Sequence, residues 1–227
     1  MHISIIIPVL NEEATVEQFL TPLTHQCKEH GYELLIVDGG STDNTVAIAE
    51  HYGRVIHSAK GRATQMNMGA KIAQGDVLLF LHADTLLPHT AFAAIEQVLT
   101  SSKVVAGAFR LRFDCDSLPY KLVAFSTNLR SRLSNIFTGD QAYFVRTESF
   151  RAVGGYPDQP LMEDLEIIAP LRKIGNVVLL PQYVTTSARR HQKIGLLRSV
   201  LFMWYLRTLY TFGTSPLRLQ QMYHDIR

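Results

Sequence analysis

Short apolar runs alternate with helix-length segments over the first hundred residues, and this alternation limits the choice of fold more than any other feature. The apolar runs are rich in valine, isoleucine and leucine and end at polar turns, which is typical of buried strands. The segments between them carry helix start and stop signals, such as Gly31 at the end of the first. The expected strands are 3–9, 33–37, 54–57 and 77–81, and the expected helices are 14–30, 42–52, 63–73 and 88–99.

A strand–helix repeat of this kind predicts a mostly parallel sheet with helices on both faces. Such sheets bind ligands at the carboxyl ends of their strands. Polar residues follow the apolar runs at these ends, at Asn11 and Glu12, at 38–41 and at 82–84. We therefore expect the functional site at this edge of an α/β sheet.

The second half of the chain is less regular. We expect one domain over residues 1–192, because no linker divides it, followed by an apolar and basic helical extension over 193–227. The expected strands are 104–113, 142–146, 177–180 and 183–186, and the expected helices are 120–133 and 163–174.

Composition excludes several classes of protein. Hydrophobic residues make up 47% and charged residues 19%, which excludes a disordered chain, a collagen and a coiled coil. The two cysteines, Cys27 and Cys115, exclude a disulfide framework and are interpreted as small buried hydrophobes. The first residues lack the basic start of a secretory signal, so a cytoplasmic location is the default expectation.

Charge is divided unevenly along the chain. Residues 1–166 contain 13 basic and 19 acidic side chains, whereas residues 167–227 contain 9 and 1. A basic tail favours contact with anions such as phosphates, acidic lipids or nucleic acid. The alternative is that the tail neutralises the acidic body.

Two strand ends carry candidate site residues. The turn 37–45, VDGGSTDNT, has glycines that let a ligand approach the backbone, and Asp38 can accept a hydrogen bond from a base or ribose. A tight turn with a capping Asp43 is the alternative. His82 and Asp84 follow the fourth strand, where an acid can hold a divalent cation or cap the next helix.

Acidic and arginine side chains in the second half complete the set of candidates. Glu163 and Asp164 can stabilise a helix start, or one of them can act as a general base. Only one can act directly, because neighbours on a helix point ~100° apart. Arg189 and Arg190 suit phosphate contacts, or form a solvated basic turn with His191.

Taken in order, these motifs resemble those of the inverting family 2 glycosyltransferases, which have the GT-A fold. The resemblance covers roughly residues 3–192 and is greatest to the small bacterial transferases of that family. It is carried by the segments IIIPVLNEE, VDGGSTDNT, GRATQMNMGAKIAQGDVLLFLHADT, GDQAYFVR and GGYPDQPLMEDLEI.

The resemblance implies a metal-dependent transfer of a sugar from a nucleotide-sugar donor to a hydroxyl acceptor. It assigns Asp164 as the general base and Asp84 as the ligand of Mn²⁺ or Mg²⁺. The residues implied to bind the nucleotide are Pro8, Leu10, Asn11, Glu12, Asp38, Gly40 and Arg62. The residues implied to lie on the diphosphate or acceptor side are His82, Asp140, Gln141, Glu163, Arg189 and Arg190.

The sequence departs from the family pattern at two positions. Gly39 stands where the family often has a second acid, which weakens any choice of base, although uracil and hence a UDP-sugar remain favoured. His82 replaces the first acid of the DxD motif. A neutral imidazole suits Mn²⁺ better than Mg²⁺, so we favour Mn²⁺.

The apolar segment 194–212 needs its own interpretation. Arg198 and Arg207 interrupt it and project to opposite sides of a helix, which disfavours a membrane span. We expect a helix that packs on the domain, forms a homodimer contact or lies at the inner face of a membrane. A lipid-linked acceptor would explain an interfacial helix and the basic tail together, and a saccharide acceptor is the alternative.

Other functions are weighed against the transferase. A non-catalytic protein that binds a nucleotide-sugar or acts as a membrane scaffold would keep the same fold. A nucleotidyltransferase lacks support, because no GxGTR-type start follows the first strand. Nucleic acid is not an expected partner, since no nucleic-acid-binding motif is present.

Overall fold

The computed structural model describes residues 1–224, apart from the side chains of Arg190 and His224, and these residues form one eight-stranded sheet. The strand order is β3-β2-β1-β4-β7-β6-β8-β5. The strands are β1 Ile3–Val9, β2 Glu33–Asp38, β3 Arg54–His57, β4 Val77–Phe80, β5 Thr85–Leu86, β6 Val104–Phe113, β7 Tyr143–Arg146 and β8 Asn176–Thr186.

The first four strands pair in parallel, as the sequence predicts. The register sets Val9 beside Asp38, so that β1 and β2 end at the same edge of the sheet. Strand β4 runs parallel to β1 on its other side. Strand β7 then pairs antiparallel with β4 and β6, and β8 returns parallel to β6. The sheet is therefore mixed: six strands run in one direction, while β7 in the middle and the two-residue β5 at the edge run antiparallel to their neighbours.

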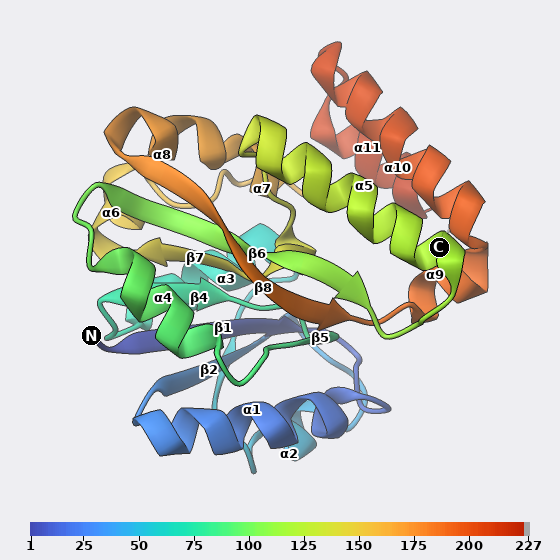
Figure 1. The fold of residues 1–227 in the computed structure, drawn as a ribbon. Coiled ribbons are helices and arrows are strands. Elements are labelled where there is room, and N and C mark those ends of the chain that lie inside the picture. The colour runs from blue at the N-terminus through green and yellow to red at the C-terminus, as the bar shows by residue number, and fades with distance from the viewer. Residues whose placement is uncertain (225–227) are drawn as a thin grey trace.

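Helices cover both faces of the sheet (Figure 1). Alternate residues of β1 point to opposite sides, so Ile5 and Ile7 join one core cluster and Ile6 joins the other. The first cluster is covered by α1 Val16–His30, α2 Thr45–Ala49 and α4 Ala91–Leu99. The second is covered by α3 Arg62–Ile72, α6 Thr147–Ala152 and α8 Ile168–Ile174.

A second group of helices stands beside this core (Figure 1). Helix α5, Leu118–Ser134, packs along β6, and helix α10, Leu196–Thr211, contacts α5. The remaining members are η1 Gly139–Gln141, α7 Glu163–Glu166, α9 Arg189–Ile194 and α11 Pro216–His224. Within residues 1–224, no helix combines the length and the apolar character that crossing a bilayer requires.

Several elements differ from their predicted bounds. The helix expected over 163–174 breaks into α7 and α8, because Pro170 has no N–H to donate to the carbonyl of Glu166. The two strand candidates after Val177 form the single strand β8, whose register against β6 shifts between Phe109 and Arg110. Cys27 is buried as expected, but Cys115 is only partly buried.

Candidate functional site

The carboxyl ends of β1, β2 and β4 form the floor of the candidate site, where the sequence predicts it. Asn11, in the left-handed conformation at φ 53°, links the first two loops. Its N–H donates to Ser41 Oγ at 2.9 Å, and its Oδ1 accepts from the Thr42 N–H at 2.8 Å. The Glu12 N–H donates to Thr45 Oγ1 at 2.7 Å. These bonds hold the loops after β1 and β2 together.

Asp38 is enclosed by its own turn. Its carboxylate accepts the N–H groups of Gly40 at 3.0 Å and Ser41 at 3.1 Å, and His57 Nδ1 lies 3.5 Å away. Burial opposes its ionisation, but these hydrogen bonds prevail and lower the pKa of Asp38. At 2% exposure, Asp38 shapes the turn that would face a nucleotide.

A buried amide explains why Gly39 carries no side chain. A Cβ at Gly39 would lie 2.9 Å from the Gln65 carboxamide. Gln65 Nε2 donates to the carbonyls of Val9 at 2.9 Å and Val37 at 2.8 Å, and so joins the ends of β1 and β2. The sequence analysis missed Gln65, because nothing local distinguishes it from other polar residues of α3.

The carboxylates of Glu12 and Asp140 lie close enough to Asp84 to act on its charge. Desolvation and the charges of Asp140 and Glu12 raise the pKa of Asp84, against the Thr85 hydroxyl and Arg189, which lower it. Arg189 Nη2 reaches Glu12 Oε2 at 3.4 Å. Excess negative charge and oxygen ligands are what a hard divalent cation requires. No three ligating side chains of residues 1–224 meet closely enough to hold a metal ion by themselves.

Gly139 connects the His82 motif with the Asp164 motif. A Cβ at Gly139 would lie 2.5 Å from His82 Nε2, so only glycine allows this approach. The N–H of Gly139 donates to Asp164 Oδ2 at 2.9 Å. The end of β4 and the start of α7, which are far apart in the sequence, therefore meet at one point.

The two adjacent acids at 163 and 164 have different environments. Glu163 is 1% exposed and forms an ion pair with Arg62 Nε through its Oε1. Burial alone would lower the pKa of Arg62, but the charges of Glu163 and Asp164 raise it. Asp164 is only half-buried. Of the two carboxylates, Asp164 is thus the one that is open to a ligand.

Two of the residues implied to lie on the diphosphate or acceptor side, Gln141 and Glu163, are enclosed by the protein. Gln141 is fully buried and does not face an acceptor. Its Oε1 accepts from Ser131 Oγ at 2.9 Å, and its Nε2 donates to the Phe109 carbonyl at 3.1 Å, so it fixes the turn η1. Glu163 is likewise enclosed by the protein. Pro8 lies within β1 and Leu10 follows it, while the Arg190 side chain lies outside the described residues.

A cleft that the sequence did not predict adjoins the site. It has a volume of about 170 Å³ and lies between α5 and α10. Its walls combine polar and apolar side chains in similar proportion, and Thr138 and Asp140 line it on either side of Gly139. The lining includes Val123, Phe202, Met203, Trp204 and Arg207.

The chain is similar to known glycosyltransferases. The family model described as glycosyl transferase family 2 matches residues 4–154. The undecaprenyl-phosphate 4-deoxy-4-formamido-L-arabinose transferase of Proteus mirabilis is 32% identical over 97 residues. This match covers 38% of the chain and 30% of that relative, so the chain corresponds to about a third of the relative's length.

Solved structures share the fold at low sequence identity. A mannosyltransferase from Pyrobaculum calidifontis, in complex with GDP-Man and Mn²⁺, gives a TM-score of 0.68 at 17% identity, over 98% of this chain and 68% of that one. Glucosyl-3-phosphoglycerate synthase from Mycobacterium tuberculosis, in complex with Mn²⁺, UDP and glucosyl-3-phosphoglycerate, gives a TM-score of 0.57 at 21% identity. The match covers 79% of this chain and 70% of that one. Both are GT-A glycosyltransferases.

Proposed function

We propose that this chain, which belongs to glycosyl transferase family 2, transfers a sugar from a nucleotide diphosphate sugar to a hydroxyl acceptor with inversion at the anomeric carbon. One observation carries the proposal: the Gly139 backbone lies against His82 and donates to Asp164 Oδ2. The end of β4, which is assigned to the donor side, and the half-buried carboxylate of Asp164 therefore lie next to the same residue. The family membership supports the donor class.

In this reaction Asp164 accepts the proton of the acceptor hydroxyl. The hydroxyl oxygen forms a bond to the anomeric carbon as the bond from that carbon to the phosphate oxygen breaks, which releases a nucleoside diphosphate. The Gly139 N–H, at 2.9 Å from Oδ2, orients the carboxylate and leaves Oδ1 for the hydroxyl. Glu163 serves a different purpose, since its pair with Arg62 fixes the start of α7.

The residues around Asp84 suit a divalent metal. We infer that Asp84 holds Mn²⁺ or Mg²⁺, with Glu12 and Asp140 adding to the negative field and the donor phosphates completing the ligands. When bound, the ion would offset the charge that develops on the leaving diphosphate. His82 favours Mn²⁺, and Mn²⁺ accompanies the nucleotide in the mannosyltransferase and synthase structures.

The donor pocket is assigned to the loops after β1 and β2. Hydrogen bonds within the loops fix Asn11, Glu12 and the 38–41 turn, where Gly40 has φ 92°, at this edge. Arg189 lies beside Glu12 and Asp84, where a diphosphate would need a cation. A UDP-sugar is favoured, and GDP is the first alternative, because the synthase is described with UDP and the mannosyltransferase with GDP-Man.

Exposed apolar side chains support contact with a membrane surface. Leu122 and Phe125 of α5 are 59% and 65% exposed, and Leu201 and Trp204 of α10 are 60% and 59% exposed. Basic residues such as the exposed Arg198 accompany them, so an anionic lipid surface fits better than a second copy of the same basic helix. We propose that residues 1–192 form the catalytic domain and that 193–227 help to seat it on the membrane, near a lipid-linked acceptor.

Substitution of the proposed base tests the transfer reaction. The Asp164→Asn variant should release nucleoside diphosphate from the donor about 10²- to 10⁴-fold more slowly and still bind UDP or GDP with Mn²⁺ in calorimetry. The exposed Asp158→Asn in the preceding loop is the matched control and should keep full turnover. Asp84→Ala should instead lose metal-dependent nucleotide binding.

The same experiment separates the alternatives. A non-catalytic nucleotide-sugar-binding protein would bind the nucleotide, yet neither wild type nor the Asp158→Asn control would turn over the donor. Flotation with anionic vesicles at low salt tests the membrane contact. A protein that stays at the bottom of the gradient and elutes as a dimer would contradict that contact.

A further inference from the structure

The residues just before Asp164 belong to a third apolar cluster, which is separate from the two clusters of the sheet. Leu161 and Met162, at 7% and 3% exposure, are two of its four buried members. The other two, Leu206 of α10 and Leu219 of α11, are fully buried. None of these four lies in a strand. The segment that leads into α7 is therefore packed by the C-terminal helices and not by the sheet.

Met162 has a backbone conformation that residues with a side chain rarely adopt. Its φ of 67° and ψ of 17° lie in the left-handed region. Such a conformation is costly for a residue with a Cβ, and it persists where the surrounding structure imposes it. Met162 is also the N-cap of α7, and its carbonyl accepts the Leu165 N–H at 3.2 Å. Because α10 and α11 enclose its side chain, these helices hold the turn from which α7 starts.

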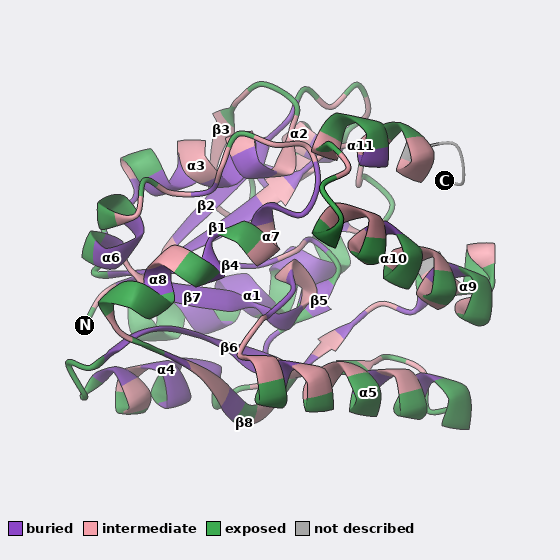
Figure 2. Ribbon diagram, turned by 90° about the horizontal axis from the view of Figure 1, so that it is seen from above, coloured by how far each residue is buried: buried purple, intermediate pink, exposed green. Residues whose placement is uncertain are grey.

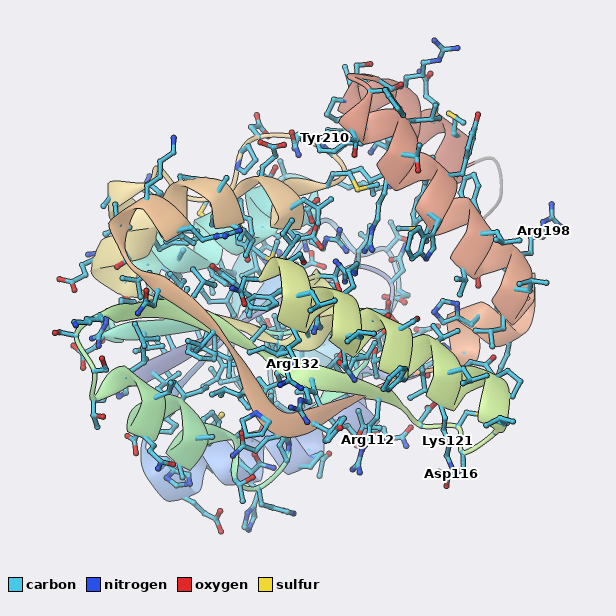
Figure 3. All side chains as sticks on the ribbon, turned by 45° about the horizontal axis from the view of Figure 1, so that its top comes forward. Arg112, Asp116, Lys121, Arg132, Arg198 and Tyr210 are labelled. Carbon is cyan, nitrogen blue, oxygen red and sulfur yellow. The ribbon has the colours of Figure 1, made fainter. Side chains whose placement is uncertain are left out.

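Tyr210 of α10 connects the two ends of the same segment. Its hydroxyl donates to Glu166 Oε1 at the end of α7, and it accepts from Gln159 Nε2, in the loop before α7, at 3.4 Å. Asp164 lies between these two contacts in the sequence. Figure 3 shows Tyr210 on the side of α10 that faces the body of the molecule, whereas Arg198 lies on the outer side. One side chain of α10 is thus bonded to the chain before and after the proposed base.

The contacts of α7 divide between two faces of the helix. At ~100° per residue, the residues that contact α10 and α11 share one face, and the others share the opposite face. The first face consists of Leu165, which packs against the third cluster, and Glu166. The second consists of Glu163, Asp164 and Ile167, which contact Arg62, the Gly139 N–H and the second sheet cluster in turn. The C-terminal helices therefore support α7 from the side away from the proposed base.

We propose that α10 and α11 position the catalytic base, so that Leu206, Tyr210 and Leu219 affect the transfer reaction through Asp164. This inference rests on the proposed transferase function. These three are positioning residues, because their contacts are with the segment that carries Asp164. Both this segment and the C-terminal helices lie outside residues 4–154, which the family model matches. The extension thus completes the active site in addition to the membrane contact proposed for its exposed side.

Truncation of Leu219 tests the support. Leu219→Ala should slow the Mn²⁺-dependent release of nucleoside diphosphate from UDP-glucose or GDP-mannose by about 10- to 100-fold and leave the KM for the donor unchanged. The matched control is Leu217→Ala, which shortens a 65% exposed side chain of the same helix and should keep full turnover. Leu219→Met keeps the apolar volume and should restore most of the rate.

The Tyr210 hydroxyl offers a milder test, for the case that the leucine variant does not fold. Tyr210→Phe keeps the ring and removes only the bonds to Glu166 and Gln159. It should slow turnover about fivefold, which is the effect of one ordinary hydrogen bond. Tyr205→Phe, on the same helix at 52% exposure, is its control and should change nothing.

A double variant separates positioning from general destabilisation. If Leu219 acts through Asp164, Leu219→Ala should cause no further loss of turnover in protein that already carries Asp164→Asn, because the positioned carboxylate is gone. Destabilisation of the whole protein would instead multiply the two losses. The same comparison applies to Tyr210→Phe.

Hydrogen exchange measures the support without any reaction. The amides of Leu165 and Ile167 donate to the carbonyls of Met162 and Glu163 at 3.2 and 3.4 Å. The peptide over 159–168 should exchange at least about tenfold faster in Leu219→Ala than in the wild type. Peptides from β1 and β4 should exchange as before, because they lie in the sheet clusters.

Three outcomes would overturn the proposal. One is unchanged exchange of the 159–168 peptide in Leu219→Ala, and another is a loss of turnover that multiplies with that of Asp164→Asn. The third is an equal loss in the Leu217→Ala control. A wild type that turns over neither donor would contradict the transferase proposal, and the exchange experiment would then still decide whether α10 and α11 hold this segment.

Discussion

The first hundred residues and the helices α5 and α10 use apolar side chains in opposite ways. Helices α1 and α4 bury Leu20 and Phe92 completely or nearly so against the sheet. Helix α5 exposes a full stripe of large apolar residues, and α10 buries only Ser199 and Leu206 of its sixteen residues. Figure 2 shows this contrast as buried strands next to largely exposed α5 and α10. The exposed stripe of α5 consists of Leu118, Leu122, Phe125, Leu129 and Leu133.

This contrast suggests different roles for the two regions, stability for the first and binding for the second. The first region gains its stability by removing apolar surface from water. The second region leaves the apolar stripe of α5 exposed, and Ser126, Thr127 and Arg207 line the cleft between α5 and α10. Exposed apolar surface of this extent marks an interaction site. We therefore expect changes in the first region to affect folding and changes in the second to affect binding.

Cysteine reactivity should give the largest difference between the two regions. Cys27 lies on the buried face of α1, where burial raises the pKa of its thiol to about 12. At pH 8 only about one such thiol in ten thousand is ionised, while Cys115 lies partly exposed before α5. We expect Cys115 to be alkylated at least about a thousandfold faster, as measured by mass spectrometry of the labelled peptides. Similar rates would mean that α1 does not protect the first core.

Truncating one leucine in each region should lower the free energy of unfolding much more in the first region than in the second. Leu79→Ala removes a fully buried side chain of β4 and should lower the free energy of unfolding by about 3 kcal/mol. Leu201→Ala shortens a side chain of α10 that is 60% exposed and should change the free energy of unfolding by less than about 0.5 kcal/mol. Urea denaturation followed by circular dichroism compares the two. A large loss for Leu201→Ala would place that residue in a core rather than on a binding surface.

The two ion pairs that join the halves should differ in strength. Arg62→Met leaves the carboxylate of Glu163, at 1% exposure, without its partner and should cost about 2–3 kcal/mol. This cost is smaller than the cost of breaking a fully enclosed ion pair, because the Arg62 side chain is 37% exposed. Arg189→Met removes the exposed contact to Glu12 and should cost under about 1 kcal/mol. The same denaturation assay measures both, and equal losses would contradict the structural role of Glu163.

Vesicle binding should show the smallest effect. Phe125→Glu places a charge in the exposed stripe of α5 and should weaken binding to anionic vesicles about tenfold, since burying one large apolar side chain contributes about 1.5–3 kcal/mol. The matched control is Ile174→Glu in α8, 49% exposed and outside the α5 and α10 surface. Cosedimentation with vesicles measures both. If the control weakens binding as much, the effect is one of overall charge and not of the apolar stripe.

Local patterns were sufficient to locate much of the candidate site. The glycines after β2, the HxD at the end of β4 and the Glu163-Asp164 pair are visible in the sequence, because polar residues end apolar strands there. Gln65 gave no such signal. The 118–133 spacing of α5 is typical of a stripe that faces a core, yet in the fold this stripe faces outward.

The sequence by itself determined the parallel half of the sheet and the edge at which its strands end, because strand and helix periodicity are read from neighbouring residues. Only the tertiary structure decided which of two adjacent acids is free, since Glu163 is neutralised by Arg62, 101 residues away. It also placed the Gly139 backbone beside His82. Charge compensation and close backbone approach depend on distances in space, and no local pattern encodes those distances.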